Sequence, residues 1–468
     1  MLCSIQRMVC NPLTVNQYNK SLIGGAMSNS DGISQLPDCI LHHILSFIPT
    51  KDVVKTSILS KRWKNLWTSV SNLDFDDALL YKEMDGQDPP NETSFMNFVD
   101  RVLLFCDTLN INKFRLSCRV CFNPSRIHTW ISSAILHNVH ELDLCLFTED
   151  PFTLPQSIFS SISLTTLKIE MNCDLQIPSS ITLPNLKTLH LSLITFPDDD
   201  LTQKLFAGCL ALEDLVLLDC EWTNLKNVMI SSSNLKRLTI DDLPYFGPPD
   251  DPGGCKITID TPNLALLKYT GYLSNEIWLC GVSELMKADI RVQVLHERQK
   301  EVTCHVVDLL KGLKDVNCLR ISKHTIESLV FVGNLVVNLP VFQNLTHLEL
   351  SMAIENSTIE ALTKFLTFCP NLQSLNFTEG FQHDICLVEN DLTWSTLRLK
   401  TLILKNFRGN VAEICFVKCV LQHGNVSEKL NICWSENLLG DIKWQEDVKM
   451  MLKMIVGVSK SCVIITWG

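Results

Sequence analysis

The chain has a deficit of positive charge and lacks long apolar runs. Its 468 residues include 40 lysines and arginines against 51 aspartates and glutamates, which gives a net charge of −11 at pH 7. A nucleic-acid-binding protein usually carries a basic surface, so this balance argues against that class. The apolar stretch 329–342 is interrupted by glycine, asparagine and proline, and spanning a bilayer takes about 20 apolar residues. We therefore expect neither a nucleic-acid partner nor a membrane segment.

Sequence motifs of common enzymes are also absent. The sequence contains no GxxxxGK[ST] phosphate-binding loop, no HExxH zinc motif and no GxSxG nucleophile motif. Cys118 and Cys121 have the spacing of zinc ligands, but no second pair follows at a suitable distance. We interpret His137 and His140 as surface polar residues, and the run Asp198–Asp200 as the cap of a helix. The sequence thus predicts a non-catalytic protein without a metal or another cofactor.

Cysteine, in contrast, is abundant. The chain has 20 cysteines, scattered among apolar neighbours, and residues 1–26 lack the apolar core of a secretory signal. Free cysteine is commonly buried, so we predict reduced core thiols in a protein of the nucleus or the cytoplasm. We expect residues 1–30 to be a disordered leader, and a start at Met27 remains an alternative.

Residues 31–76 are dense in apolar side chains at helical spacing. Pro37 suits the first turn of a helix that Pro49 ends, Thr50 suits the cap of a second helix, and Ser60 that of a third. Three short helices make a small core, and a unit of this size usually needs outside support. The pattern therefore predicts a helical docking module.

The order of residues in this stretch resembles the F-box of plant F-box proteins, with an unrelated three-helix bundle as the alternative. The segments that carry the resemblance are Leu36-Pro37-Asp38, 44–51, 56–63, Leu66-Trp67 and Leu73-Asp74-Phe75. The resemblance implies docking on the Skp adaptor of SCF (Skp–cullin–F-box) ubiquitin ligases. The residues that match the adaptor-binding pattern are Leu36, Pro37, Ile40, Leu41, Ile44, Leu45, Ile48, Pro49, Val53, Val54, Leu59, Trp63 and Trp67.

After a predicted linker at 77–93, the pattern apolar-x-x-apolar-x-apolar recurs through the predicted repeat domain, residues 94–394, and once more at 399–404. Its middle residues are Phe114, Leu142, Leu167, Leu189, Leu215, Leu238, Leu267, Ala288, Leu319, Leu348, Leu375 and Leu402. Successive copies lie 21 to 31 residues apart, and leucine-rich repeats have periods of about 20–29 residues. Each copy predicts a short strand, and return segments such as 127–135 predict helices. We expect an α/β solenoid with a parallel sheet; a generic α/β domain with leucine-rich strands is the alternative.

The character of the chain changes over residues 395–468. The sequence predicts strands at 399–404, 426–434 and 462–467, and helices around 414–421 and 448–456. This region resembles the C-terminal FBD domain of plant F-box proteins, through Asn406-Phe407-Arg408-Gly409, although that family usually has glycine where Asn406 stands. The resemblance implies an α+β domain.

The order F-box, leucine-rich repeats and FBD domain implies the substrate-recognition subunit of an SCF ubiquitin ligase. Such a subunit meets the cullin and the RING protein through the adaptor, and its repeats hold a target protein. One alternative is an adaptor-bound scaffold or sequestering protein that never assembles with cullin. Another is a small-ligand sensor, which usually needs a cluster of basic residues that the sequence does not show. The residues that bind the target cannot be assigned, because the repeat pattern identifies only the core.

Overall fold

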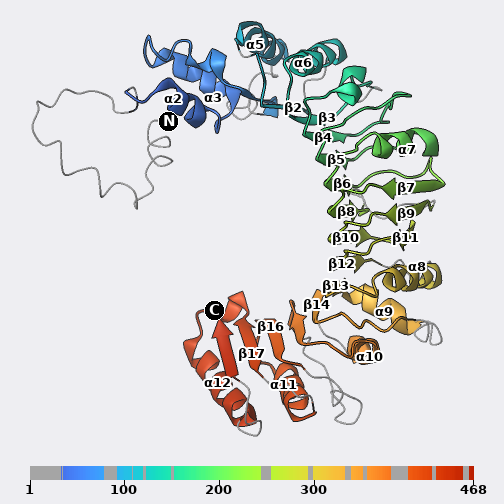
Figure 1. Ribbon diagram of the computed structural model, residues 1–468. Helices are drawn as coiled ribbons and strands as arrows, with labels where there is room; N and C mark the ends of the chain where they lie inside the picture. Colours follow the sequence, from blue (N-terminus) through green and yellow to red (C-terminus); the bar gives the residue numbers. More distant parts are fainter. Residues whose placement is uncertain are drawn as a thin grey trace, which may run out of the picture. The chain divides into compact units, whose positions relative to one another are not determined.

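A computed structural model describes residues 33, 35–78, 92–107, 109–119, 123–148, 152–243, 254–293, 299–331, 339–351, 356–380, 399–423, 428–456 and 463–467 (Figure 1). The chain divides into two compact units, Met1–Val70 and Ser71–Gly468. The predicted leader at residues 1–30 lies outside the described residues. None of the described helices combines the length and the apolar character that a bilayer crossing requires.

The first unit has two short α-helices, α2 (Asp38–Leu45) and α3 (Thr50–Lys55), each preceded by a proline at its N-cap. A 3₁₀ turn follows at Thr56–Ile58. The predicted third helix is shorter than expected, because residues 61–65 form turns and only Leu66–Ser69 is helical, as a 3₁₀ turn. Trp63 and Leu66 are three residues apart, a spacing that a 3₁₀ turn places on one side, and both are buried.

The second unit is built on one parallel sheet. Among the described residues it has fifteen strands, in the order β1-β2-β3-β4-β5-β6-β8-β10-β12-β13-β14-β15-β16-β17-β18. The strands are β1 (Asn72–Asp76), β2 (Lys113–Cys118), β3 (Glu141–Leu146), β4 (Thr166–Met171), β5 (Thr188–Ser192), β6 (Asp214–Leu218), β8 (Arg237–Asp241), β10 (Leu266–Gly271), β12 (Lys287–Val292), β13 (Cys318–Ser322), β14 (His347–Ser351), β15 (Ser374–Phe377), β16 (Thr401–Phe407), β17 (Lys429–Trp434) and β18 (Val463–Trp467). Every predicted copy of the repeat forms a strand, so the predicted leucine-rich-repeat solenoid is confirmed.

The alternation within each strand explains the sheet. In β6 the side chains of Leu215 and Leu217 are fully buried, whereas those between them remain half-exposed. Leu215 lies opposite Leu189 on one side and Leu238 on the other. Burial of one such leucine is worth about 1.5–3 kcal/mol, and the stacked rows form a core that no single repeat could make.

Figure 1 shows the helices of the second unit on one side of the large sheet. They are α5 (Glu92–Phe105), α6 (Pro124–Leu136), α7 (Asp199–Ala207), α8 (Gln299–Gly312), α9 (Lys323–Phe331), α10 (Asn356–Leu366), α11 (Val411–His423) and α12 (Ile442–Val456). We call the opposite side, which these helices do not cover, the open face. Single 3₁₀ turns lie at Gln156–Ser160 and Glu436–Leu438. The cap predicted at the acidic run is confirmed: the Asp198 carboxylate accepts a hydrogen bond of 2.8 Å from the Leu201 amide at the start of α7.

An asparagine that directly precedes the first leucine of many repeats ties each repeat to the one before it. The Asn185 side-chain amide donates to the Ile162 carbonyl at 2.8 Å, and that of Asn234 to the Leu210 carbonyl at 2.9 Å. Asn263 and Asn371 make the same bond. This row satisfies carbonyls that the strand ladder leaves free, and the sequence pattern did not predict it.

A second parallel sheet of three strands, in the order β11-β9-β7, was also not predicted. It consists of β7 (Asn227–Ser231), β9 (Lys256–Asp260) and β11 (Glu276–Cys280). Side chains of α7 cover its β7 edge: the Asp199 carboxylate accepts from the Lys226 amide at 2.8 Å, and the Gln203 carbonyl from the Met229 amide at 3.0 Å. Paired in this way, the edge is protected against pairing with another chain.

Strands β16, β17 and β18 continue the repeat sheet through the region that resembles the FBD domain. The predicted strands and helices appear in the predicted order, and the strands pair in parallel with the repeats. Helix α12 begins earlier than expected, because Asp441 accepts from the Trp444 amide at 3.0 Å and caps it. At the other end, β1 pairs with β2, so residues 77–93 follow the first strand; 79–91 of this predicted linker lie outside the described residues.

Candidate functional site

The first unit has a complete but small core. Its buried members are Leu41, Leu45, Val53, Trp63, Leu66 and Val70, and Ile33, Leu36, Ile48 and Trp67 pack against them. The helices are short, so nearly every apolar residue that faces inward is needed to form this core. The need to build a core from short helices explains why this stretch of the sequence is so rich in large apolar residues.

Two of the motifs that carry the F-box resemblance meet in space. The Arg62 guanidinium donates to the Asp38 carboxylate at 2.5 Å and also to the Leu36 carbonyl. This fork ties the segment before Trp63 back to the start of α2. Both charged side chains are exposed to solvent, and such pairs contribute about 0–1 kcal/mol. We therefore interpret this ion pair as a contact that fixes the geometry of the unit and adds little to its stability.

The predicted adaptor-binding residues separate into three groups by exposure. Those that are buried in the core are Leu41, Leu45, Val53 and Trp63. Those that are partly buried are Leu36, Ile44, Ile48, Pro49, Val54 and Trp67, and those that are exposed are Pro37, Ile40 and Leu59. In this conformation the first group stabilises the module, and the last group is free to contact another protein. Adaptor contact itself remains a prediction.

The structure adds two exposed apolar residues that the sequence prediction missed. Phe47 is 66% exposed and Ile58 is 86% exposed, compared with 44% for Ile40 and 47% for Leu59. The ring of Phe47 lies edge-on to that of His43, 4.9 Å away. Large apolar side chains exposed to this extent are available to a partner protein. Both residues lie within the segments that carry the F-box resemblance. The sequence pattern did not show that their side chains are exposed.

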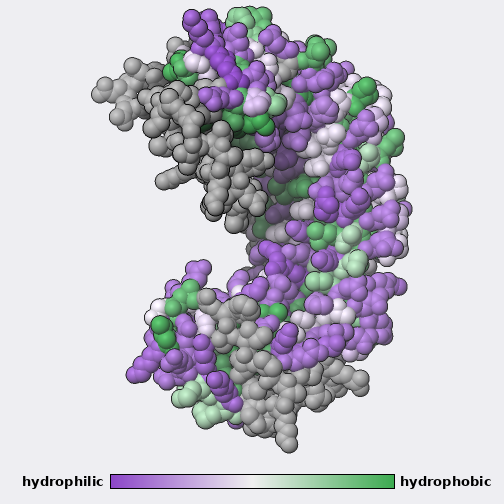
Figure 2. All heavy atoms as spheres, turned by 60° about the vertical axis from the view of Figure 1, so that its left-hand side comes forward, coloured by the Kyte–Doolittle hydropathy of each residue, from purple (hydrophilic) through white to green (hydrophobic). Residues whose placement is uncertain are grey.

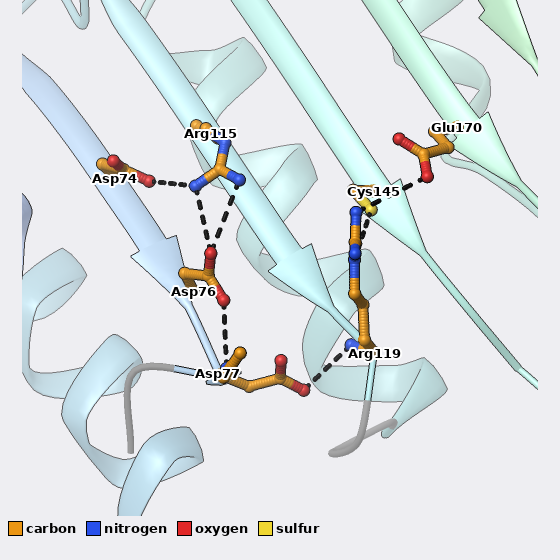
Figure 3. Close-up of polar contacts among 8 residues, drawn as sticks. Asp74, Asp76, Asp77, Arg115, Arg119, Cys145 and Glu170 are labelled. Carbon is orange, nitrogen blue, oxygen red and sulfur yellow. Dashed lines mark hydrogen bonds and ion pairs between the residues drawn. The ribbon is translucent and has the colours of Figure 1, made fainter. Parts of the chain in front are cut away.

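The open face of the repeat sheet, formed by the side chains that alternate with buried ones, carries paired charges. At its β1 end, Arg115 donates to Asp74 at 2.9 Å and lies 3.4 Å from Asp76 (Figure 3). Burial acts to lower the pKa of Arg115, but the hydrogen bond and charge of Asp74 raise it above its usual value. The arginine is thus a permanent cation, neutralised by its neighbours on β1.

A second group on the open face surrounds Arg119, at the end of β2. Its side chain donates to the Cys145 thiol at 3.2 Å and lies 3.6 Å from Glu170, and its amide donates to Asp77 (Figure 3). Burial raises the pKa of the Cys145 thiol, against the opposing hydrogen bond from Arg119. A thiol with a raised pKa is a poor nucleophile, so Cys145 is not an activated thiol.

A third charged group crosses β12, β13 and β14. Asp289 pairs with Arg291 at 2.9 Å and with Arg320 at 3.5 Å, and Arg320 also pairs with Glu349. Asn376 donates to Glu349 at 2.9 Å. Between the charged groups, β6 presents Val216 and Leu218 on this face. Figure 2 likewise shows a mostly hydrophilic surface with hydrophobic residues in small groups. Such a face suits a protein partner.

Two of the motifs that were considered as metal sites are the histidine pair at 137 and 140 and the cysteine pair at 118 and 121. His137, the residue after α6, donates a hydrogen bond from its ring Nδ1 to the Ser133 carbonyl at 2.8 Å. Cys121, the second residue of the weighed Cys118–Cys121 pair, lies outside the described residues. Within the described ranges, no three His, Cys, Asp or Glu side chains are grouped so as to hold a metal ion.

Comparisons with known proteins match both units. The F-box domain family model matches residues 33–75, and the model described as "FBD-associated F-box protein At5g56370, LRR repeats" matches residues 127–248. The chain is 31% identical to the Putative F-box protein At3g58860 of Arabidopsis thaliana, over 93% of this chain and 95% of that protein.

Two further relatives come from the same plant. The Putative F-box/FBD/LRR-repeat protein At3g59240 of Arabidopsis thaliana is 33% identical over 75% of this chain and 69% of its own length. The Putative F-box/LRR-repeat protein At3g49150 of Arabidopsis thaliana is 36% identical over 76% of this chain, which spans 56% of that relative. F-box domains generally bind Skp-type adaptors, and proteins of this kind are typically non-catalytic. The matches at both units and the repeat sheet place this chain in the plant family of F-box proteins with leucine-rich repeats and an FBD region.

Proposed function

We propose that the chain is the substrate-recognition subunit of an SCF ubiquitin ligase in the nucleus or the cytoplasm. Its F-box unit docks on a Skp-type adaptor and, through the adaptor, joins the cullin and the RING protein. The open face of the repeat sheet holds a target protein for ubiquitination. The family membership supports the adaptor step, and the paired charges of the open face support a protein partner.

The observation that carries the proposal is that the first unit has two sets of apolar residues, one buried in its core and one exposed to solvent. Leu41, Leu45, Val53 and Trp63 complete a core, so exposed apolar residues such as Ile40, Leu59 and Ile58 are not needed to hold the unit together. Burial of one such side chain by a partner contributes about 1.5–3 kcal/mol. A few anchors of this kind are enough to dominate an interface.

The chain would contribute proximity and no bond chemistry of its own. A target held on the repeats reacts with a ubiquitin-charged enzyme in the same assembly, so the reaction becomes effectively intramolecular. Effective concentrations in the millimolar range are typical of flexibly linked partners, and they do not require any new contact.

The test is affinity capture of the intact chain from plant cell extract, with antibodies against the Skp adaptor and cullin. An Ile40→Asp/Leu59→Asp variant places charges on the exposed surface and leaves the core leucines in place. Leu210→Asp is the matched control, because Leu210 is also an exposed leucine, on the repeat unit. We expect both partners with the intact chain and the control, and neither with the double variant.

Each outcome distinguishes the possible functions. Recovery of adaptor without cullin would favour the adaptor-bound scaffold or sequestering protein over the ligase receptor. Recovery of neither partner with the intact chain would contradict adaptor binding altogether. Retention of both partners by the double variant would place the docking surface elsewhere in the chain.

A further inference from the structure

The motif Asn406-Phe407-Arg408-Gly409, which the function above does not use, forms one wall of a surface pocket. The pocket has a volume of about 590 Å³, within the range of ligand sites. The residues that line it are Arg408, Gly409, Asn410, Val411, Ser435, Asn437, Leu438 and Trp444. They come from the turn between β16 and α11, the start of α11, the 3₁₀ turn Glu436–Leu438 with the serine before it, and the first turn of α12.

The turn that forms this wall is held rigidly. Gly409 has φ +70°, and a side chain at this position would collide with Val448 of α12. The Glu413 carboxylate accepts from the Arg408 amide at 2.9 Å and the Asn410 amide at 3.1 Å, and the Asn410 side chain accepts from the Glu413 amide at 2.9 Å. The Trp444 indole donates to the Arg408 carbonyl at 3.1 Å. The pocket is therefore preorganised.

The pocket is lined by one cationic side chain, that of Arg408, and by neutral polar and apolar ones. Among the described residues no carboxylate pairs with the Arg408 guanidinium, although the chain as a whole is acidic. None of the lining residues is a carboxylate. A pocket that offers a guanidinium without a carboxylate partner suits an anion.

The surroundings indicate a singly charged anion. Glu413 lies behind the turn, and Asp441 caps α12 next to Trp444. These two carboxylates would repel a phosphate dianion but leave Arg408 able to form a forked pair with one carboxylate. Trp444, Leu438 and Val411 add an apolar wall beside the arginine. The complementary group is a carboxylate next to an apolar side chain.

We propose that this pocket binds a segment of a partner protein in which an aspartate or glutamate stands next to an apolar residue. The acidic side chain pairs with Arg408, and the apolar side chain packs on Trp444. The inference deepens the proposed function, because the partner would be the target protein.

The first experiment measures binding of a fluorescein-labelled peptide, Gly-Ser-Leu-Glu-Phe-Ser-Gly, to the full chain by fluorescence polarisation. The peptide with Gln in place of Glu is the comparison, because it has nearly the same size and shape but no negative charge. We expect the acidic peptide to bind about tenfold or more tightly than its amide counterpart, because a charge-assisted hydrogen bond is lost. Equal binding of the two peptides would overturn the proposal.

Variants then locate the site. Arg408→Gln should weaken the acidic peptide about tenfold or more, and Arg408→Lys should restore part of the affinity, because it keeps the charge without the fork. Lys405→Gln is the matched control, since Lys405 is an exposed cation three residues away that does not line the pocket. An equal effect of Lys405→Gln and Arg408→Gln would overturn the assignment to this pocket.

A third arm separates the two sources of a carboxylate. If free 3-phenylpropionate binds as tightly as the peptide, the pocket serves a small acid and the peptide proposal fails. The binding assay needs neither adaptor nor ubiquitin. Its failure is therefore distinguishable from failure of the proposed ligase role, which the capture experiment tests with Arg408 intact.

Discussion

The buried carboxylate of Glu413 provides the sharpest test of how the C-terminal turn is held. Glu413 is fully buried, and its side chain accepts hydrogen bonds from the backbone amides of Arg408 and Asn410. Replacement by alanine leaves two donors in a site that water does not reach. A hydrogen bond to a charged group contributes about 1.5–3 kcal/mol. Some of this is regained because a charge is no longer buried, so we expect Glu413→Ala to destabilise the turn by about 2–4 kcal/mol.

The loss of stability should be confined to the region around this turn, because each repeat contacts only its neighbours. Hydrogen–deuterium exchange with mass spectrometry on peptides that cover residues 405–423 would measure it. A loss of 2–4 kcal/mol corresponds to roughly 30- to 800-fold faster exchange at the affected amides. Glu413→Gln keeps one acceptor oxygen and should recover part of the protection.

Glu446→Ala is the matched control for this experiment, because Glu446 is an exposed carboxylate on α12. It should leave exchange at 405–423 unchanged. The reasoning would be refuted if Glu413→Ala changed exchange there by less than about threefold, since about 1.4 kcal/mol corresponds to tenfold. It would also be refuted if the change spread equally to the repeats at β2 to β6.

Three further predictions concern stability and reactivity. Leu215→Ala should destabilise the repeat unit by about 2–5 kcal/mol in chemical denaturation, and Leu210→Ala by less than about 0.5 kcal/mol, because only Leu215 is buried. Burial raises the pKa of Asp242 to about 7, so the folded state binds the extra proton and stability should fall as pH rises from about 4 to about 7, a slope that Asp242→Asn should remove. Burial raises the pKa of Cys209 to about 12, so iodoacetamide at pH 8 should label exposed Cys280 and spare Cys209 in peptide mapping. A flat pH profile or equal labelling of the two thiols would contradict the corresponding argument.

The repeat core could be predicted from the sequence because it depends on a local pattern. Leu215 and Leu217 alternate with exposed residues, and the same alternation returns at each repeat, so strand and core follow together. The small sheet has a similar signal: Val228 and Ile230 are buried in β7 and alternate with exposed residues. That alternation falls between two repeats, where the period predicts only a return segment, and it was therefore overlooked.

Features that join distant parts of the chain could not be predicted in this way. The pocket requires Trp444 to reach the Arg408 carbonyl from 36 residues away. The asparagine row uses residues such as Asn234 that resemble ordinary turn residues in sequence. In the F-box unit, the pattern indicated which residues are apolar but not that Leu41 would be buried and Ile40 exposed. Helical spacing fixes a face, and only the packed unit decides how far each side chain on it is covered.

The paired charges of the open face also limit how such an array can change in length during evolution. Arg320 on β13 lies between Asp289 on β12 and Glu349 on β14, in register with both. Unequal recombination that removed the repeat of β13 would preserve every leucine row and still place Asp289 opposite Glu349. Like charges directly opposite each other in a sheet are destabilising. Gain or loss of repeats is therefore expected in blocks that keep opposite charges adjacent, even though the leucine core alone would accept any number.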